Sequence, residues 1–201
     1  AYHDTLQHFY DLGARYIQLD DTTWGYLIAQ LNANADNAAA RAQFEKTAQD
    51  DVYVINKALA GLPSDLKLST HVCRGNFKST YLFEGGYEAV AKYLGQLNYD
   101  AFFLEYDNDR SGGFEPLKDI YNGRNNVAIV LGLLTSKSAD LAKVDDVVAR
   151  INEAAKFVPK SQLALSTQCG FSSTEEGNIL TIPDQWKKLA LIKRIADEQF
   201  V

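Results

Sequence analysis

Four residues of types that bind soft metal ions stand just after predicted strands of this chain. His71 and Cys73 lie two residues apart in segment 69–75 (STHVCRG), so both side chains leave the end of an extended strand on the same face. Glu105 ends another apolar run, and Cys169 follows a further one. Protein zinc sites use four such ligands when they are structural, and three plus an exchangeable position when they are catalytic. The set of four therefore predicts a zinc site.

Each of these residues also has an ordinary structural explanation when it is taken alone. A single cysteine is usually a small buried apolar residue, and a single histidine usually satisfies its hydrogen bonds locally. The chain holds only two cysteines, so a disulfide between Cys73 and Cys169 is a further alternative. The placement of all four residues at equivalent points of a repeating strand pattern favours a metal, which would keep both cysteines as thiolates.

Composition places the chain among ordinary globular proteins and excludes several partner classes. Its 201 residues, with 46% hydrophobic and 23% charged content, suit a single domain over 1–201. A formal charge of -6 without long single-sign runs gives no basis for binding nucleic acid or an anionic membrane. No apolar stretch approaches the roughly 20 residues that span a bilayer, and the N-terminus lacks a signal pattern. We therefore expect a cytoplasmic protein.

The apolar periodicity predicts strands that alternate with helices, which is typical of an α/β protein with a parallel sheet. Short apolar runs bounded by turn residues predict strands over 15–19, 66–71, 101–105, 127–131 and 162–166. Amphipathic or capped segments predict helices over 2–12, from Asn34 or Asp36 to Leu59, after a break at 84–86 up to Leu97, over 117–121 and 140–157, and over 185–200 after a capped start at 181–184.

Two architectures fit these units: an open doubly wound sheet and a (β/α)8 barrel of the TIM type. An open sheet would usually carry a glycine-rich phosphate turn, and none follows any predicted strand here. A closed ring also brings the tips of separate strands, here those that precede His71, Glu105 and Cys169, around one point. These two observations favour the barrel.

The predicted barrel is incomplete. A complete one normally needs ~250 residues and eight units, whereas this chain of 201 residues supplies about five. The chain also starts at Ala1 within a predicted helix and contains no methionine, so we expect it to be the C-terminal part of a barrel. Open strand edges tend to associate, so the chain could self-associate through them. Size-exclusion chromatography would test this expectation, and a sharply melting monomer would contradict it.

These motifs resemble those of the cobalamin-independent methionine synthases, in their C-terminal catalytic barrel. The resemblance covers nearly the whole chain and is strongest to short relatives that lack the N-terminal barrel. In that family a His-x-Cys pair, a Glu at the end of the next strand and a Cys followed by Gly hold a zinc ion. By resemblance these ligands are His71 and Cys73 in THVC, Glu105 in FLE and Cys169 in QCG. The implied activity is zinc-dependent methyl transfer to a thiol such as homocysteine, in methionine biosynthesis.

The acidic pair after the first predicted strand resembles the family's site for the amino group of homocysteine. By that resemblance Asp20 would bind the substrate ammonium group. A carboxylate at a strand tip in the mouth of a barrel is well placed for such a contact. The alternative is that Asp20 or Asp21 caps the following turn.

Three departures from the family pattern concern the methyl donor. Thr22 and Tyr26 stand where the family has a proline and a glutamate assigned to folate, and Lys137 replaces a histidine credited with proton donation. The family's first three strands, which carry further substrate contacts, are absent from this chain. The resemblance therefore leaves the donor unidentified, and the chain alone could be inactive.

The expected chemistry is activation of a thiol by zinc. A free thiol with a pKa of about 8.5 is mostly protonated at neutral pH, and coordination to the metal deprotonates it. Glu105 is the ligand expected to yield when the thiol arrives. Two other interpretations fit the same ligands: a corrinoid-dependent thiol methyltransferase, and a structural zinc domain without turnover. Arg74, Arg110 and Lys137 lie in loops on the same face and could meet a carboxylate or an anionic donor.

Overall fold

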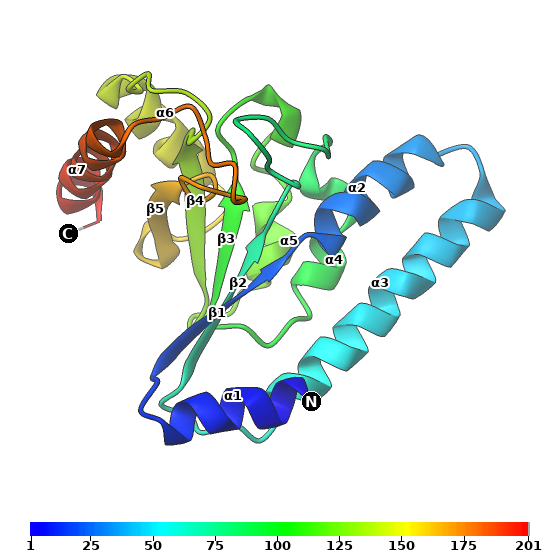
Figure 1. The fold of residues 1–201 in the computed structure, drawn as a ribbon. Helices are drawn as coiled ribbons and strands as arrows, with labels where there is room; N and C mark the ends of the chain where they lie inside the picture. The colour runs from blue at the N-terminus through cyan, green and yellow to red at the C-terminus, as the bar shows by residue number, and fades with distance from the viewer. Residues whose placement is uncertain (201) are drawn as a thin grey trace.

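A computed structural model describes residues 1–200 of the chain. In these residues five parallel strands form one sheet and are neighbours in chain order (Figure 1). The strands are β1 (Tyr16–Asp21), β2 (Lys67–Val72), β3 (Ala101–Glu105), β4 (Ala128–Leu134) and β5 (Leu163–Thr167). All five lie where the apolar runs predicted them, and the predicted α/β class is confirmed.

The strand order identifies the sheet as part of a barrel. A doubly wound sheet reverses its strand order at a switch point, whereas a barrel places each strand beside the previous one. β1 and β5 are the two ends of the strand order in the described range, so the ring is open there. The fold is thus an incomplete barrel of the TIM type, as predicted. Self-association through the outer edges of β1 and β5 stays a prediction.

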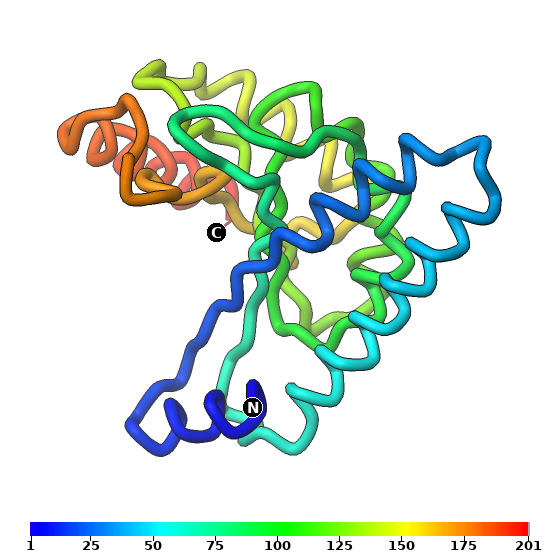
Figure 2. Tube along the Cα trace, turned by 45° about the vertical axis from the view of Figure 1, so that its right-hand side comes forward, coloured from blue at the N-terminus to red at the C-terminus, as the bar shows by residue number. Residues whose placement is uncertain are grey.

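The helices between the strands pack along one side of the sheet, α1 precedes β1 and α7 follows β5 (Figures 1 and 2). They are α1 (Tyr2–Asp11), α2 (Thr23–Ala33), α3 (Ala38–Leu59), α4 (Ala91–Leu94), α5 (Leu117–Tyr121), α6 (Val144–Ala154) and α7 (Ile182–Gln199), with 3-10 turns at Tyr87–Ala89, Asp109–Ser111 and Lys160–Gln162. The predicted cap of the last helix is present, because Thr181 and Asp184 form a capping box. None of the helices within residues 1–200 is long and apolar enough to cross a membrane.

α6 is shorter than the helix predicted over 140–157. It begins at Val144, and the four preceding residues form a loop. In that loop the carbonyl oxygen of Asp140 accepts a hydrogen bond from Lys188, an almost fully buried side chain of α7. The loop therefore satisfies a buried ammonium group, which a longer α6 would leave without this acceptor.

The two faces of the sheet differ in burial because alternate side chains of a strand point to opposite sides. On the side covered by helices, Val72, Phe102 and Leu131 are completely buried. On the other side, β1 presents Gln18 and Asp20, which are exposed. This second face would line the interior of a complete barrel.

Residues 24–33 carry no predicted element, but in the structure they belong to α2. The apolar residues of this helix recur at helical spacing and are fully buried: Trp24, Leu27, Ile28 and Leu31. Gly25 allows α2 to approach the end of β2, because a Cβ atom there would lie 2.5 Å from the carbonyl oxygen of Cys73. α2 therefore packs directly against the backbone of the His71–Cys73 segment.

Candidate metal centre

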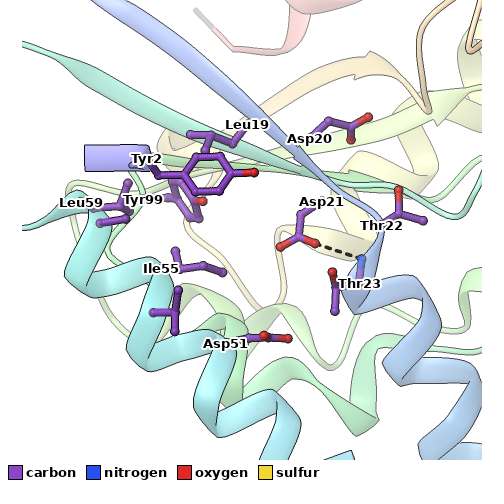
Figure 3. Close-up of a pocket in the computed structure, with 12 residues that line it drawn as sticks. Tyr2, Leu19, Asp20, Asp21, Thr22, Thr23, Asp51, Ile55, Leu59 and Tyr99 are labelled. Carbon is purple, nitrogen blue, oxygen red and sulfur yellow. Dashed lines mark hydrogen bonds between the residues drawn. The ribbon is translucent and has the colours of Figure 1, made fainter. Parts of the chain in front are cut away.

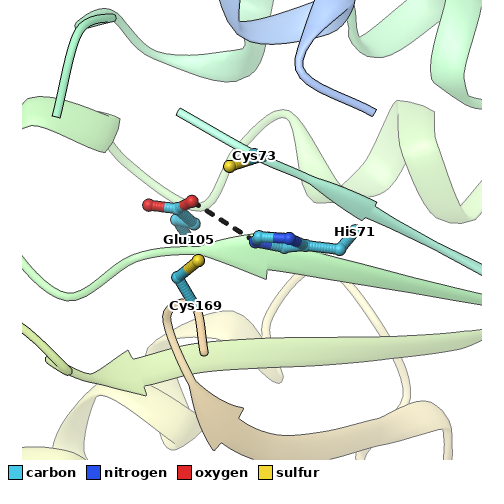
Figure 4. A group of neighbouring side chains, drawn as sticks. All are labelled: His71, Cys73, Glu105 and Cys169. Atoms are coloured by element: carbon cyan, nitrogen blue, oxygen red, sulfur yellow. Dashed lines mark ion pairs between the residues drawn. The ribbon is translucent and has the colours of Figure 1, made fainter. Parts of the chain in front are cut away.

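His71, Cys73, Glu105 and Cys169 come together at the carboxyl ends of the strands (Figure 4). One potential ligand atom from each residue lies within 4.8 Å of the others. His71 belongs to β2, Cys73 follows that strand, Glu105 ends β3, and Cys169 comes just after β5. The first three residues are buried and Cys169 is partly exposed. The structure thus assembles the predicted ligand set, while metal binding itself stays a prediction.

Parallel pairing and one glycine explain how these residues meet. β3 pairs with β2 on one side and with β4 on the other, where Glu105 lies opposite Gly132. Gly132 leaves space at this point, because a Cβ atom there would lie 2.8 Å from the Cα of Gln168. The segment that carries Cys169 can therefore pass over β4 and approach Glu105.

His71 is held in one orientation by contacts at both ring nitrogens. Its Nδ1 lies 2.7 Å from Oδ1 of Asp20. Its Nε2 faces the cluster, 3.3 Å from Oε1 of Glu105 and 3.1 Å from the carbonyl oxygen of Gln168. Metal-binding histidines commonly donate their second ring N–H to a carboxylate in this way. Nε2 is therefore the ring nitrogen that would face a metal ion, and Asp20 orients the imidazole ring through Nδ1.

Asp21, the neighbour of Asp20, points to the opposite side of β1 (Figure 3). Its Oδ1 accepts a hydrogen bond of 2.9 Å from the backbone N–H of Thr23, at the start of α2. Asp21 is therefore the residue of the acidic pair that caps the following turn. A pocket of about 490 Å³ lies on this side, between β1 and α3, and neither cysteine lines it.

A smaller pocket of about 190 Å³ opens beside the cluster. It is lined by His71 and Cys169 together with Gln18, Phe103 and Ser166, among others. These side chains lie at the face of the sheet opposite to its covering helices in the part of the chain that the structure describes. The position of this pocket next to two of the four candidate ligands makes it the place where a small thiol could reach a bound metal.

Neighbouring charges shift the pKa values of the cluster. Burial would lower the pKa of His71, but hydrogen bonds with Asp20 and Glu105 raise it to about 10. A hydrogen bond with Cys169 lowers the pKa of Cys73 to about 6, although burial opposes this shift. The same pairing raises the pKa of the Cys169 thiol. Burial would raise the pKa of Glu105, but contact with His71 holds it below its usual value.

Metal binding is therefore expected to release protons from His71 and Cys169. Both carry a proton near neutral pH in the metal-free chain, whereas the Cys73 thiolate does not need to lose one. We expect release of about two protons per zinc ion near pH 7, because ligands must be deprotonated to bind. The apparent affinity should then rise with pH, and it should rise less steeply once the pKa of His71, about 10, is passed, because only Cys169 then still has a proton to release.

Isothermal titration calorimetry in buffers of different ionisation enthalpy measures the number of protons released. A zinc affinity that stays constant between roughly pH 6 and pH 9 would contradict the assignment of His71 and Cys169 as ligands.

The four side chains fit a zinc ion chemically. Thiolate, imidazole and carboxylate ligands bind zinc at roughly 2.0–2.3 Å in a tetrahedron, whose corners are then roughly 3–4 Å apart. The observed separations, within 4.8 Å, are close to that spacing. Calcium and magnesium instead prefer oxygen ligands alone. The donor set therefore favours zinc over these hard cations.

The three cations expected near an anionic ligand are engaged within the protein. Arg110 lies 2.6 Å from Glu105 and 2.6 Å from Asp107, and Lys137 pairs with Asp107 as well. Arg74 is completely buried and lies over a tyrosine ring, 4.3 Å from its centroid. Arg110 and Lys137 are therefore neutralised by buried carboxylates, whereas Arg74 donates to the carbonyl oxygen of Gly85 and forms no ion pair within residues 1–200.

Two amide side chains without a predicted role also contact the candidate ligands. Asn76 donates to Oε1 of Glu105 at 2.6 Å, and Gln168 donates to Oε2 at 3.3 Å. Both positions are adjacent to ligand motifs, since Gln168 directly precedes Cys169 and Asn76 follows Cys73 by three residues. This proximity is the only feature of the sequence that points to the two amides. Amides are frequent in loops, however, and the sequence does not show which of them face the cluster.

Comparison with known proteins relates the chain to one family. A family model described as "Cobalamin-independent synthase, Catalytic domain" matches residues 1–182. Two uncharacterized proteins of Bacillus subtilis (strain 168), YxjH and YxjG, are 48% and 47% identical to the chain over 205 and 199 residues. Each alignment covers 98% of this chain and 52% of the relative. The chain thus spans about half the length of these curated relatives.

Solved structures agree with this relationship. A putative vitamin-B12 independent methionine synthase from Listeria monocytogenes shares 37% identity with a TM-score of 0.72, and the match covers 98% of this chain and 52% of the other. A B12-independent methionine synthase from Shewanella sp. W3-18-1, solved in complex with selenomethionine, has a TM-score of 0.70 over the same shares at 20% identity. The second likeness concerns the fold alone.

Proposed function

This chain belongs to the cobalamin-independent synthase family, by its catalytic domain, and on that premise we propose that it forms the zinc-binding part of a methyltransferase. The proposed acceptor is a small thiol such as homocysteine, and the proposed pathway is methionine biosynthesis. The observation that carries the proposal is the convergence of two thiols, an imidazole and a carboxylate within 4.8 Å. Residues 1–201 would be the C-terminal portion of a methionine-synthase-like barrel.

The four residues would each have a defined part in holding the metal. His71 would bind through Nε2, Cys73 and Cys169 through their sulfur atoms, and Glu105 through a carboxylate oxygen. A bound zinc ion supplies the positive charge that turns a thiol, with a pKa of about 8.5 when free, into a thiolate near neutral pH. Two thiolates and one carboxylate bring the formal charge of the loaded site to about −1, which favours an electron-rich acceptor sulfur over hydrolytic activation of water.

Asp20 is proposed to contact the amino group of the acceptor. Its Oδ1 faces His71, but its side chain is 61% exposed, so Oδ2 remains accessible at the tip of β1. A carboxylate in this position can pair with an ammonium group while it orients the imidazole. Asp20 would therefore couple substrate placement to the geometry of the metal ligand.

The proposed transfer forms a bond between the acceptor sulfur and the methyl carbon as the bond between that carbon and the donor breaks. The thiol proton leaves when the acceptor is deprotonated, and the leaving group of the donor keeps the bonding electron pair. The sequence and the site restrict the acceptor, but they do not select the donor. A folate donor and a corrinoid donor, the latter implying a corrinoid-dependent enzyme, are therefore both to be assayed.

X-ray absorption at the zinc edge tests the proposal on the chain itself. With homocysteine present, we expect one oxygen or nitrogen ligand to be exchanged for sulfur, because a catalytic site must admit the acceptor. A ligand shell that does not change would favour the alternative of a structural zinc domain. Methionine formation from folate and corrinoid methyl donors then separates the two enzyme classes, and failure to bind zinc at all would overturn the proposal.

A further inference from the structure

The carboxylate of Glu105 is surrounded by hydrogen-bond donors on all sides. Oε1 accepts from the backbone N–H of Arg74 at 3.0 Å and from Nδ2 of Asn76 at 2.6 Å. Oε2 accepts from Nη2 of Arg110 at 2.6 Å and from Nε2 of Gln168 at 3.3 Å. A carboxylate has about four lone-pair positions, so these four donors occupy its whole capacity even before Nε2 of His71, 3.3 Å from Oε1, is counted. A metal ion at Glu105 must compete with at least one of them.

The two amides among these donors are fixed by further contacts. Nε2 of Gln168 also donates to Oδ1 of Asn76 at 2.9 Å. Oε1 of Gln168 accepts from the backbone N–H and the hydroxyl of Ser136 at 2.8 Å and 2.5 Å. Asn76 is 8% exposed and Gln168 is 1% exposed. Because each amide oxygen already accepts a hydrogen bond, each NH2 group is held towards Glu105.

Within residues 1–200, the other three candidate ligands have no such set of donors on their ligand atoms. Nδ2 of Asn76 lies 3.6 Å from the sulfur of Cys73, and Ser173 lies 3.6 Å from the sulfur of Cys169. Because sulfur is a weak hydrogen-bond acceptor, these contacts hold the ligand atoms less strongly than the donors around Glu105 hold its carboxylate. The competition between protein donors and a metal ion is therefore concentrated on the carboxylate.

We propose that Asn76 and Gln168 are positioning residues that hold the Glu105 carboxylate in competition with a metal ion and so make Glu105 the exchangeable ligand of the cluster. The inference rests on the proposed zinc site. When Glu105 gives up its place to an acceptor thiol, the two amides together with Arg110 keep its charge hydrogen-bonded in the interior. Without them the displaced carboxylate would be a buried charge with fewer partners, which is strongly unfavourable.

This positioning role predicts that substitution of the amides strengthens zinc binding, which is the opposite of the usual effect. Removing a residue that supports a metal ligand normally weakens metal binding by about 10- to 100-fold. Gln168→Met keeps the length of the side chain but cannot donate to Glu105, so it should strengthen zinc binding by about tenfold, because the metal-free carboxylate loses a charge-assisted hydrogen bond. The same variant should bind homocysteine about tenfold more weakly, since Glu105 then yields less readily.

The experiment measures both affinities on the whole chain. Competition with a chromogenic chelator gives the zinc affinity, and homocysteine titration of cobalt(II)-loaded protein, followed by thiolate-to-cobalt absorption, gives the thiol affinity. Gln96→Met is the matched control, because Gln96 is exposed and donates only to the carbonyl oxygen of Lys92, and it should leave both affinities unchanged. Asn76→Leu should change both in the same directions as Gln168→Met.

The outcomes separate this inference from the proposed function. Weaker or unchanged zinc binding in both amide variants, with thermal unfolding like that of the wild type, would overturn the positioning role and leave the zinc site standing. A wild-type chain that binds no zinc would overturn both. If Gln168→Met does not fold, Ser136→Ala takes its place, because it removes a hydrogen bond that orients Gln168 without touching Glu105, and a gain in zinc affinity is again required.

Discussion

Cys169→Ser is expected to lose tight zinc binding, with the affinity falling by more than about 100-fold. Replacement of groups that only support a metal ligand already costs about 10- to 100-fold, and this change removes a ligand itself. A serine hydroxyl is neither as soft nor as readily deprotonated as a thiol, so it does not replace the sulfur. Chelator competition measures the affinity, and the zinc content of the purified protein gives an independent reading.

The matched control for Cys169→Ser is Ser172→Ala, in the same loop. The Ser172 hydroxyl is exposed and donates to the carbonyl oxygen of Thr174, so its loss should leave zinc binding unchanged. Zinc binding that survives in Cys169→Ser would exclude the segment after β5 from the metal centre. The remaining residues of the cluster, His71, Cys73 and Glu105, would then have to form the site without it.

Much of this cluster could be predicted because its candidate ligands follow a simple rule of strands. His71 and Cys73 are two apart, so they leave β2 on one side, and Glu105 ends the next strand. Parallel neighbours carry such positions to the same edge of the sheet. The apolar runs predicted all five strands in the described residues. The strand rule therefore places His71, Cys73 and Glu105 near one another, whereas Cys169, which follows β5, was brought to them by the closed-ring interpretation and the family resemblance.

The parts that escaped prediction depend on contacts between distant loops. Gln168 meets Asn76 and Glu105 across 92 and 63 residues of chain, and neither contact follows from any local period. The partner of His71 is a similar case, since only the pairing of β1 with β2 reveals that Asp20 lies opposite His71. No element was predicted for α2, whose helix is favoured by the burial of Trp24 and the other apolar residues on one face in the folded chain.

Arg110→Met is expected to lower the free energy of unfolding of the metal-free chain by about 3–5 kcal/mol, which is the usual cost of removing one partner from a buried ion pair. The guanidinium group lies 2.6 Å from both Glu105 and Asp107, and the three side chains are 3%, 0% and 1% exposed. Lys137 still neutralises the charge of Asp107 after the change, so Glu105 is the carboxylate that mainly loses its cationic partner. Urea unfolding at pH 7 measures this change in the free energy of unfolding.

The pH dependence of this loss identifies Glu105 as its origin. In the wild type, burial would raise the pKa of Glu105, but His71, the backbone N–H of Arg74 and, as a smaller contribution, the charge of Arg110 hold it below its usual value. Such a group contributes stability above its unfolded pKa, and this contribution is lost as the pH falls through the folded pKa. The difference between wild type and Arg110→Met should therefore be largest near pH 7 and shrink towards about pH 4, where a less stabilised Glu105 can take up a proton.

The control is Arg194→Met, because Arg194 is exposed on α7 and its loss should change stability by less than about 0.5 kcal/mol. A difference for Arg110→Met that stays constant from pH 7 to about pH 4 would place the cost in lost packing against Tyr81, whose ring centroid lies 4.2 Å from the guanidinium carbon. A difference that shrinks instead assigns it to the charge of Glu105. The same arginine that stabilises the fold would then hold the candidate ligand in its charged form, ready for a metal ion.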